Sequence, residues 1–201
     1  IEKFIVSRRL MYWQVYLHKT SIAADHMLMN ALKRAKDLVS EGNVDLPMSP
    51  SLLHFMTNKI SLEVFLKDKT HLDQFLRLDD VDILYALKMW MNVDDPVLSF
   101  LSTCLINRDL FKTKYTDKDQ KNELLSSMKK EFYQRHPQLE GMDKYLFSQG
   151  AVENNAYIPG RDSILVKLKD GSIKDIAEDA EVLTIKALSS PMIKHYICFP
   201  S

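Results

Sequence analysis

The chain has 201 residues, of which 46% are hydrophobic and 27% are charged, so it can bury a sizeable core as one domain or two small ones. Lysine plus arginine and aspartate plus glutamate number 27 each, and this balance gives no sign of attraction to nucleic acid or to a membrane. Any site for an anion must therefore be local.

The first segment predicts a helix with an unusual face. Residues 7–19 hold two arginines, three aromatic rings, a histidine and a lysine, and the helical pattern continues to about Val39. At 100° per residue, one quadrant of this helix holds Arg8, Tyr12, Val15, Tyr16 and Lys19. Guanidinium groups bind phosphate through two hydrogen bonds and tyrosine rings pack on sugars or bases, so the face suits a phosphorylated, ring-bearing ligand. The alternative is structural, with the rings in the core and the cations reaching past them to water.

Short elements follow this helix. Gly42 favours a helix end, and a turn-rich connection follows at residues 46–50. Two short apolar pieces lie at residues 52–58 and 61–66. We expect all of residues 1–107 to form a helical part that contains one glycine.

Two acidic clusters predict helix starts. Asp79 and Asp80 precede a helical pattern at residues 81–90, where carboxylates complement the positive end of a helix. Asp95 precedes a proline at the first position of a further helix, which ends near residue 107. We interpret these acids as helix caps rather than as catalytic groups.

The pattern changes at Arg108. Residues 117–134 predict a polar-rich helix, and strands are predicted at 110–115, 145–147, 163–168, 172–174 and 194–199. Asp170-Gly171 is a hairpin signal, and an amphipathic segment with Leu183 and Leu188 precedes the last strand. The predicted fold is therefore mainly α over residues 1–107, followed by a small α+β subdomain with an antiparallel sheet over residues 108–201.

Cysteine usage and the missing motifs limit the chemistry. Cys104 and Cys198 are far apart in sequence, and no signal peptide or apolar run of transmembrane length is present, so we expect free, buried thiols in a reducing cytoplasm. No GxGxxG, P-loop, HExxH or GxSxG motif occurs, and this excludes nucleotide binding through a glycine-rich loop. The six histidines form no i,i+4 pair on one helix, so we assign no metal ligand in this chain.

Two separated motifs resemble the HD-domain phosphohydrolases. Val15, Tyr16, His18 and Lys19 match the V-Y-x-H-K core of the helix that follows the family's metal site, and Arg8 matches the arginine eight residues before the tyrosine. Residues 107–112, with the sequence NRDLFK, are similar to the family's R-x-L-F-K segment. The similarity covers roughly residues 1–115. It is greatest to the branch that hydrolyses deoxynucleoside triphosphates to the nucleoside and triphosphate.

The resemblance implies a role for each matched residue. Arg8 would contact substrate phosphate, Tyr12 would lie in the same pocket, and Tyr16 would pack against the deoxyribose. An activator site for a nucleotide, formed where subunits meet, would include His18, Lys19, Arg108 and Lys112. A solvated junction is the alternative for the last two residues.

The His-Asp dipeptide that gives the family its name is absent from this chain. In the family this pair binds the catalytic divalent metal together with a further histidine and a distal aspartate. The resemblance therefore implies that the metal ligands lie upstream of Ile1 and that this chain alone is inactive. The chain also begins inside a helical pattern without a cap, which favours a piece of a longer polypeptide.

We therefore predict the carboxy-terminal part of a metal-dependent phosphohydrolase that acts on nucleoside triphosphates or related phosphoesters. Its expected partners are its own amino-terminal HD portion and further copies in a homo-oligomer, with no membrane. The alternative, from another class, is a non-catalytic nucleotide-binding, oligomerisation or regulatory module that uses the same face without chemistry. A third interpretation is a processed form that stays paired with its amino-terminal piece in a nicked enzyme.

Overall fold

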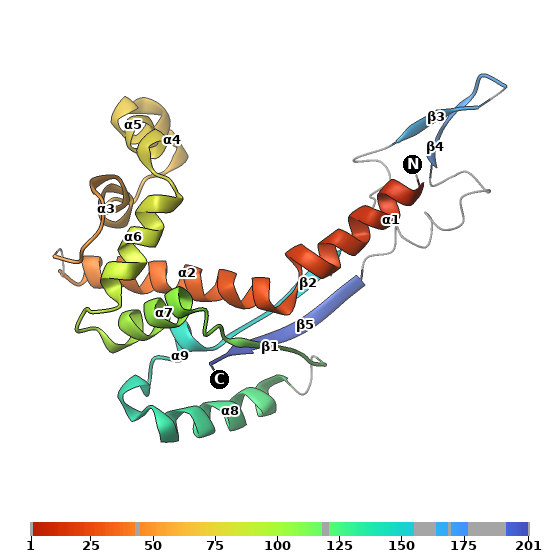
Figure 1. Ribbon diagram of the computed structural model, residues 1–201. Coiled ribbons are helices and arrows are strands. Elements are labelled where there is room, and N and C mark those ends of the chain that lie inside the picture. The colour runs from red at the N-terminus through yellow and green to blue at the C-terminus, as the bar shows by residue number, and fades with distance from the viewer. Residues whose placement is uncertain are drawn as a thin grey trace.

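The computed structural model describes residues 2–42, 45–117, 121–154, 164–168, 170–176 and 192–200. These residues are mainly helical, with a three-stranded sheet and a separate two-stranded hairpin (Figure 1), which confirms the predicted fold class. The helices are α1 Glu2–Met11, η1 Tyr12–Tyr16, α2 Lys19–Ser40, α3 Pro50–Thr57, α4 Leu62–Lys67, α5 Lys69–Arg77, α6 Asp80–Trp90, α7 Pro96–Asn107, α8 Lys121–Arg135, η2 Pro137–Leu139 and α9 Asp143–Leu146. The strands are β1 Lys112–Tyr115, β2 Ser148–Asn154, β3 Leu165–Lys167, β4 Ile173–Asp175 and β5 Met192–Phe199.

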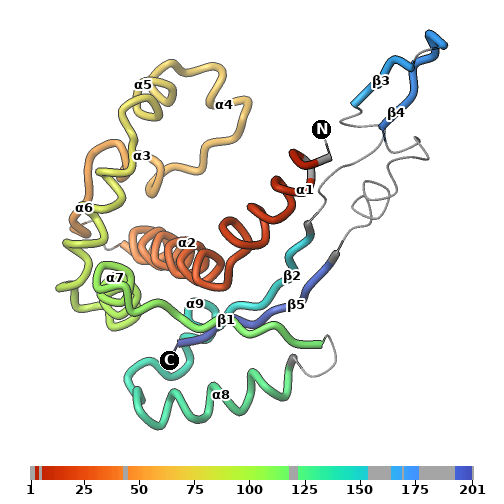
Figure 2. Tube along the Cα trace, turned by 45° about the vertical axis from the view of Figure 1, so that its right-hand side comes forward, coloured from red at the N-terminus to blue at the C-terminus, as the bar shows by residue number. Residues whose placement is uncertain are grey.

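Helix α2 is the centre of the molecule, because α3, α7, α9 and the sheet all pack against it. Its buried face has a spacing of four residues, at Ala23, Met27, Ala31 and Ala35. The three alanines carry the smallest side chains that still favour a helix, so neighbouring backbones can approach closely. Figures 1 and 2 show the three-stranded sheet between α2 on one side and α8 on the other.

Short polar side chains cap several helices, and the sequence predicts two of these caps. Asp79 caps α6, where its side chain accepts from backbone amides while Asp82 accepts from the amide of Asp79. Asp95 Oδ1 accepts from the amide of Leu98 at 2.8 Å, and Pro96 is the first residue of α7. Both predicted caps are confirmed.

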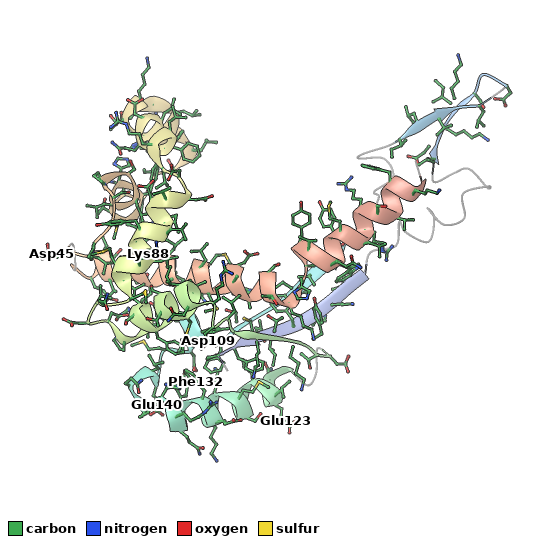
Figure 3. The ribbon with its side chains drawn as sticks, in the orientation of Figure 1. Asp45, Lys88, Asp109, Glu123, Phe132 and Glu140 are labelled. Carbon is green, nitrogen blue, oxygen red and sulfur yellow. The ribbon has the colours of Figure 1, made fainter. Side chains whose placement is uncertain are left out.

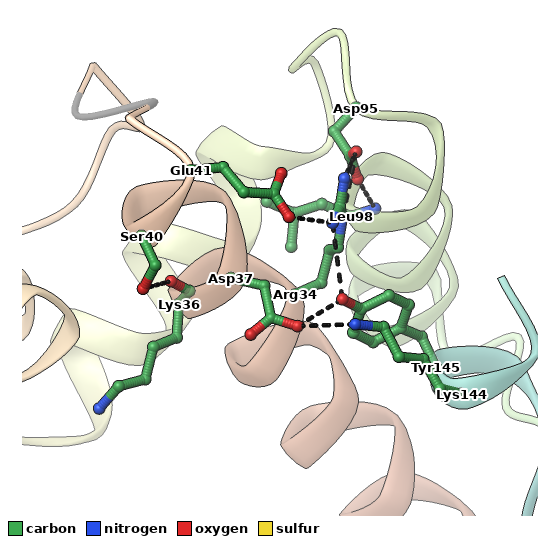
Figure 4. A network of polar contacts seen from close by, with 9 residues as sticks. All are labelled: Arg34, Lys36, Asp37, Ser40, Glu41, Asp95, Leu98, Lys144 and Tyr145. Atoms are coloured by element: carbon green, nitrogen blue, oxygen red, sulfur yellow. Dashed lines mark hydrogen bonds and ion pairs between the residues drawn. The ribbon is translucent and has the colours of Figure 1, made fainter.

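A polar network joins α2, α7 and α9 (Figure 4). The Arg34 guanidinium donates to Asp95 Oδ2 through Nη2 at 2.7 Å and through Nε at 3.1 Å. Tyr145 donates its hydroxyl proton to Asp37 Oδ2 at 2.5 Å, and Lys144 Nζ lies 3.1 Å from the same oxygen. The hydrogen bond from Tyr145 is the main reason that the pKa of Asp37 is lowered. These contacts fix the short helix α9 against the second half of α2.

The three-stranded sheet is antiparallel, with strand order β1-β5-β2. Tyr196 on the central strand β5 is paired with Tyr115 on β1 and with Gly150 on β2. A Cβ atom at Gly150 would lie 2.5 Å from the Tyr196 hydroxyl oxygen, so the tyrosine ring occupies the space where any other residue would place its side chain. The glycine is therefore required for this packing.

The hydrophobic core is continuous across residue 107. Phe132 on α8 (labelled in Figure 3) belongs to the same buried cluster as Trp90 and Leu98 of the helical part. Phe111, just after the junction, is buried and donates its amide proton to the sulfur of Met27 at 3.2 Å. The two parts therefore share one core, and the division into residues 1–107 and 108–201 stays a prediction.

Two expectations about local structure are wrong. Residues 145–147, predicted as a strand, lie mostly in α9, and the strand β2 starts only at Ser148. The alternation of Tyr145 and Phe147 suggested a strand, but Leu146 between them is fully buried as well. The helix predicted from residue 7 to about 39 is also interrupted, at Leu17 and His18.

Other expectations are confirmed or lie outside the described residues. Helix α2 ends at Ser40, and Gly42 has a φ of +101°. Gly171, with a φ of +85°, turns the hairpin between β3 and β4. The amphipathic segment with Leu183 and Leu188 lies outside the described residues. No helix in the described part of the chain combines the length and apolar composition that crossing a membrane requires.

Candidate functional site

The segment that carries the predicted site contains a π-helical turn, η1, between α1 and α2. The Leu17 amide donates to the carbonyl oxygen of Tyr12, five residues back, at 2.7 Å. In an α-helix the amide would donate to the carbonyl oxygen four residues back. His18 then has an extended conformation, and its Nδ1 accepts from the Thr20 amide at 3.2 Å, which starts α2. The π-helical turn therefore ends the helix that α1 begins, and α2 starts as a separate helix.

Arg8, Tyr12 and Tyr16, the three residues predicted to bind substrate, line one cavity. It has a volume of about 560 Å³, and its other lining residues are Phe4, Ser7 and Met11. The guanidinium carbon of Arg8 lies 5.8 Å from the centre of the Tyr12 ring. The Tyr12 and Tyr16 ring centres are 5.3 Å apart. The lining therefore combines one cation with two adjacent phenol rings and the apolar side chains of Phe4 and Met11.

This arrangement can hold a ligand that has an apolar or ring-shaped part and an anionic part. Arg8 is exposed, and its guanidinium group can donate two hydrogen bonds to a phosphate. Tyr16 is 56% exposed, so most of its ring is available to a ligand. Phe4, Ser7 and Met11 were not predicted from the sequence. Phe4 and Met11 lie four and three residues from Arg8, a helical spacing that could have found them, whereas Ser7 directly precedes Arg8.

The predicted quadrant of five residues is only partly correct. Lys19 does not share the cavity of Arg8, because the π-helical turn and the extended His18 separate the two residues. Val15 is exposed and is absent from the lining residues of the cavity. The prediction assumed a continuous rotation of 100° per residue, which holds only as far as Met11.

Lys19 and Lys112, two residues of the predicted activator site, line a second hollow. Its volume is about 370 Å³, and its walls come from the start of α2, from β1 and its preceding residue, and from the end of β5. Lys114 and Phe199, which were not predicted from the sequence, add a third ammonium group and a ring to this hollow. Three cations around one hollow with little opposing charge among the described lining residues suit a polyanion.

The other two residues of the predicted activator site lie elsewhere. His18 is exposed and caps α2 with its side chain, and it is not among the described residues that line the second hollow. Arg108 ends α7 in the left-handed conformation, with a φ of 60° and an exposed side chain, and it also does not line that hollow. Within one copy of the chain, the structure therefore brings together two of these four residues.

A larger hollow, of about 800 Å³, lies between the end of β1, the start of β5 and the start of α8. Lys114, Lys194 and His195 line it together with Asp117 and Glu123. The mixture of charges gives no preference for an anion or a cation. No sequence signal pointed to this hollow, because its walls come from segments about 80 residues apart along the chain.

The described residues offer neither a metal centre nor a reactive thiol. The described ranges contain no group of three or more His, Cys, Asp or Glu side chains placed to hold a metal ion. They therefore do not fit the metal site that the HD family implies. Cys104 and Cys198 are free and buried, as predicted, and burial raises the pKa of each thiol to about 11.

Comparisons with curated proteins give two relatives. The chain is 36% identical over 112 residues to the uncharacterized protein YwfO of Bacillus subtilis, which is 56% of this chain and 24% of that protein. It is 27% identical over 125 residues to the MG461 homolog of Mycoplasma pneumoniae, which is 62% of this chain and 29% of that protein. The chain thus spans less than a third of these relatives. No family model matches the chain.

The comparison with solved structures gives a similar protein over the full length of this chain. It is a phosphohydrolase of Bacteroides thetaiotaomicron, with a TM-score of 0.86 and 41% sequence identity. The match covers 100% of this chain and 49% of that protein. The chain therefore has the fold of about half of a phosphohydrolase of known structure.

Proposed function

We propose that this chain is the carboxy-terminal part of a metal-dependent phosphohydrolase of the HD family, in the branch that acts on deoxynucleoside triphosphates. Its substrates are nucleoside triphosphates or related phosphoesters. Support comes from the structural likeness to a phosphohydrolase at 41% identity and from the two sequence motifs. The divalent metal would be bound by residues outside this chain, since the described residues do not fit it.

The observation that carries the proposal is the shared cavity of Arg8, Tyr12 and Tyr16. The sequence motifs could have matched by chance, with the three side chains pointing into different surroundings. Instead a cation and two phenol rings line one open hollow of about 560 Å³ along α1 and η1, which supply all of its described lining residues.

Each residue of the cavity has a separate task in this proposal. The Arg8 guanidinium binds a phosphate of the substrate, and its positive charge compensates the triphosphate charge. Tyr16 packs its ring on the sugar, where its bulk disfavours a 2′-hydroxyl by crowding. Tyr12 stands between them, in ring contact with Tyr16 and beneath the Arg8 guanidinium, and thereby holds both side chains in place.

The second hollow extends the proposal to regulation. We infer that Lys19 and Lys112 bind an activating nucleotide through its phosphates, with Lys114 as a third cation. In this view His18 and Arg108 reach the same nucleotide from another subunit of a homo-oligomer, because the described residues of one copy do not bring them to the hollow.

The test uses the full-length protein that contains this chain. Turnover of a mixture of deoxynucleoside triphosphates with a divalent metal is followed by the release of nucleoside and inorganic triphosphate. Arg8→Ala should lower kcat/KM by roughly 10- to 100-fold, because a charged hydrogen-bonded pair with phosphate is lost. Tyr16→Ala should also impair turnover, whereas Tyr16→Phe, which keeps the ring, should retain most of it.

Arg9→Ala is the matched control, because Arg9 is adjacent, carries the same charge and is absent from the described lining of the cavity. Wild-type kinetics in both Arg8→Ala and Tyr16→Ala would end the site assignment. A full-length wild-type protein that binds nucleotides without hydrolysing any of them would instead favour the non-catalytic module.

A further inference from the structure

We propose that Tyr115 is a positioning residue for the Arg8, Tyr12 and Tyr16 cavity, because its hydroxyl group fixes the end of the π-helical turn to the sheet. The inference rests on the proposed function for its substrate and names a residue that no sequence motif indicates. Tyr115 is the last residue of β1 and is 98 positions along the chain from the backbone atom that it holds.

The central contact is a single hydrogen bond. The Tyr115 hydroxyl donates to the carbonyl oxygen of Leu17 at 3.0 Å. Leu17 directly follows Tyr16 and is the first residue after the turn. Burial raises the pKa of the Tyr115 phenol, so the group remains a donor over the whole physiological range.

The last carbonyl groups of a helix need hydrogen-bond donors from outside the helix, because no intrahelical amide reaches them. The Val15 carbonyl oxygen accepts from the Ser21 hydroxyl at 2.8 Å, which is a contact within the same segment. The Leu17 carbonyl oxygen instead accepts from another part of the fold. The position of the turn relative to the sheet therefore depends on Tyr115.

Two lysines surround the Tyr115 ring. The ammonium nitrogen of Lys19 lies 5.2 Å from the ring centre and that of Lys194 lies 5.4 Å from it. Lys194 also lies 4.3 Å from the centre of the Trp13 ring, which belongs to the π-helical turn itself. These cation–π contacts form a second link between the sheet and η1.

The consequence for the cavity follows from the spacing along the turn. Tyr12 and Tyr16 are the first and last residues of η1, and both line the cavity. A turn that is released at Leu17 changes the direction of the Tyr16 ring and thereby the wall on which the sugar packs. Since these side chains contact the substrate away from the reacting bond, their displacement should raise KM more than it lowers kcat.

The experiment compares Tyr115→Phe with Tyr133→Phe in the full-length protein. Both changes remove one hydroxyl group and keep the ring; Tyr133 on α8 donates to Asp143, away from η1. Amide hydrogen exchange is measured over peptides that cover residues 12–21. We expect Tyr115→Phe to speed exchange there by about tenfold, the effect of losing one hydrogen bond, while Tyr133→Phe leaves it unchanged.

Kinetics complete the test. Tyr115→Phe should raise KM for the triphosphate by roughly three- to tenfold with kcat within about twofold of wild type, and Tyr133→Phe should change neither. Unchanged exchange, or faster exchange with an unchanged KM, would overturn the proposal. A wild-type protein without turnover would show that the proposed function fails; exchange would then still decide whether Tyr115 holds the turn.

Discussion

The Nε2 atom of His26 lies 2.7 Å from the hydroxyl oxygen of Tyr196, and this contact joins the first half of α2 to the central strand of the sheet. The Tyr196 ring fits there because Gly150 on the neighbouring strand has no side chain. A histidine, a tyrosine and a glycine from three elements therefore form one packing unit beside the segment that carries the candidate site.

Stability should depend on pH through His26. Burial lowers the pKa of its imidazole below 6.5, and the nearby Asp25 carboxylate offsets this only in part. The unfolded chain therefore binds more protons than the folded chain just below pH 6.5, so the free energy of unfolding falls as the pH decreases through this value and levels off below the folded pKa.

Urea denaturation at about pH 7.5 and about pH 5.5 measures this dependence. The variant His26→Gln cannot take up the proton, so the difference between the two pH values should be smaller than in wild type. An equal difference in both proteins would show that His26 does not contribute.

Gly150→Ala should destabilise the fold. The added Cβ would lie 2.5 Å from the Tyr196 hydroxyl oxygen and 2.7 Å from the ring carbon that bears it, so the ring would have to move and the contact with His26 would be lost. Overpacking of this kind costs about 1–3 kcal/mol. In a double-mutant cycle measured by urea denaturation, the cost should largely vanish in the Tyr196→Ala background; additive costs would contradict the explanation.

Breaking the ion pair between Arg34 and Asp95 should destabilise the fold more than Gly150→Ala does. Both side chains are largely buried, with exposed fractions of 11% and 10%. Asp95→Ala would leave the guanidinium group without its carboxylate and α7 without its cap, at a cost of about 3–5 kcal/mol. Asp95→Asn keeps a capping oxygen and should cost less. Equal losses in the two variants would mean that the capping oxygen has no role and that the charge accounts for the whole effect.

Lys112 and Arg108, which the sequence resemblance assigns to one activator site, should differ in their effect on nucleotide binding. Lys112→Ala should weaken the binding of a nucleoside triphosphate at this hollow by roughly tenfold, because one of three ammonium groups is removed. Arg108→Ala should have no effect in the monomer, where its side chain does not reach the hollow. Calorimetry measures the affinity of both variants for the nucleotide in monomeric and oligomeric fractions. A loss of affinity in the monomeric Arg108→Ala variant would contradict the structure.

Local signals were sufficient for the helix starts and for part of the site. Asp79 and Asp95 were predicted as caps because capping needs only a side chain and amides two or three residues later. Arg8, Tyr12 and Tyr16 were predicted to share a face because they lie within nine residues of one another. At this range, helical geometry alone fixes which side chains are neighbours.

Contacts between distant segments explain what the sequence could not predict. The Leu17 carbonyl oxygen, at the interruption, accepts from the Tyr115 hydroxyl 98 positions away. Helix α9 is held by Asn30, which donates to the Tyr145 carbonyl oxygen at 2.9 Å from 115 positions away. The sequence analysis left residues 69–77 unassigned, and they form the short helix α5. Lys114 and Phe199 could not be assigned to the second hollow before the pairing of β1 with β5 was known.

The π-helical turn also makes the number of residues in this segment critical. A π-helix holds one residue more in its hydrogen-bonded ring than an α-helix, and in η1 the Leu17 amide and the Tyr12 carbonyl oxygen close this ring. Deleting one residue between Tyr12 and Tyr16 would reduce the ring to the α-helical size, while the extended His18 keeps the register of α2 separate. Tyr12 and Tyr16 would then be three residues apart instead of four, so the contact between their rings would change. A frame-preserving deletion of a single codon here would thus alter the candidate site while leaving both neighbouring helices intact.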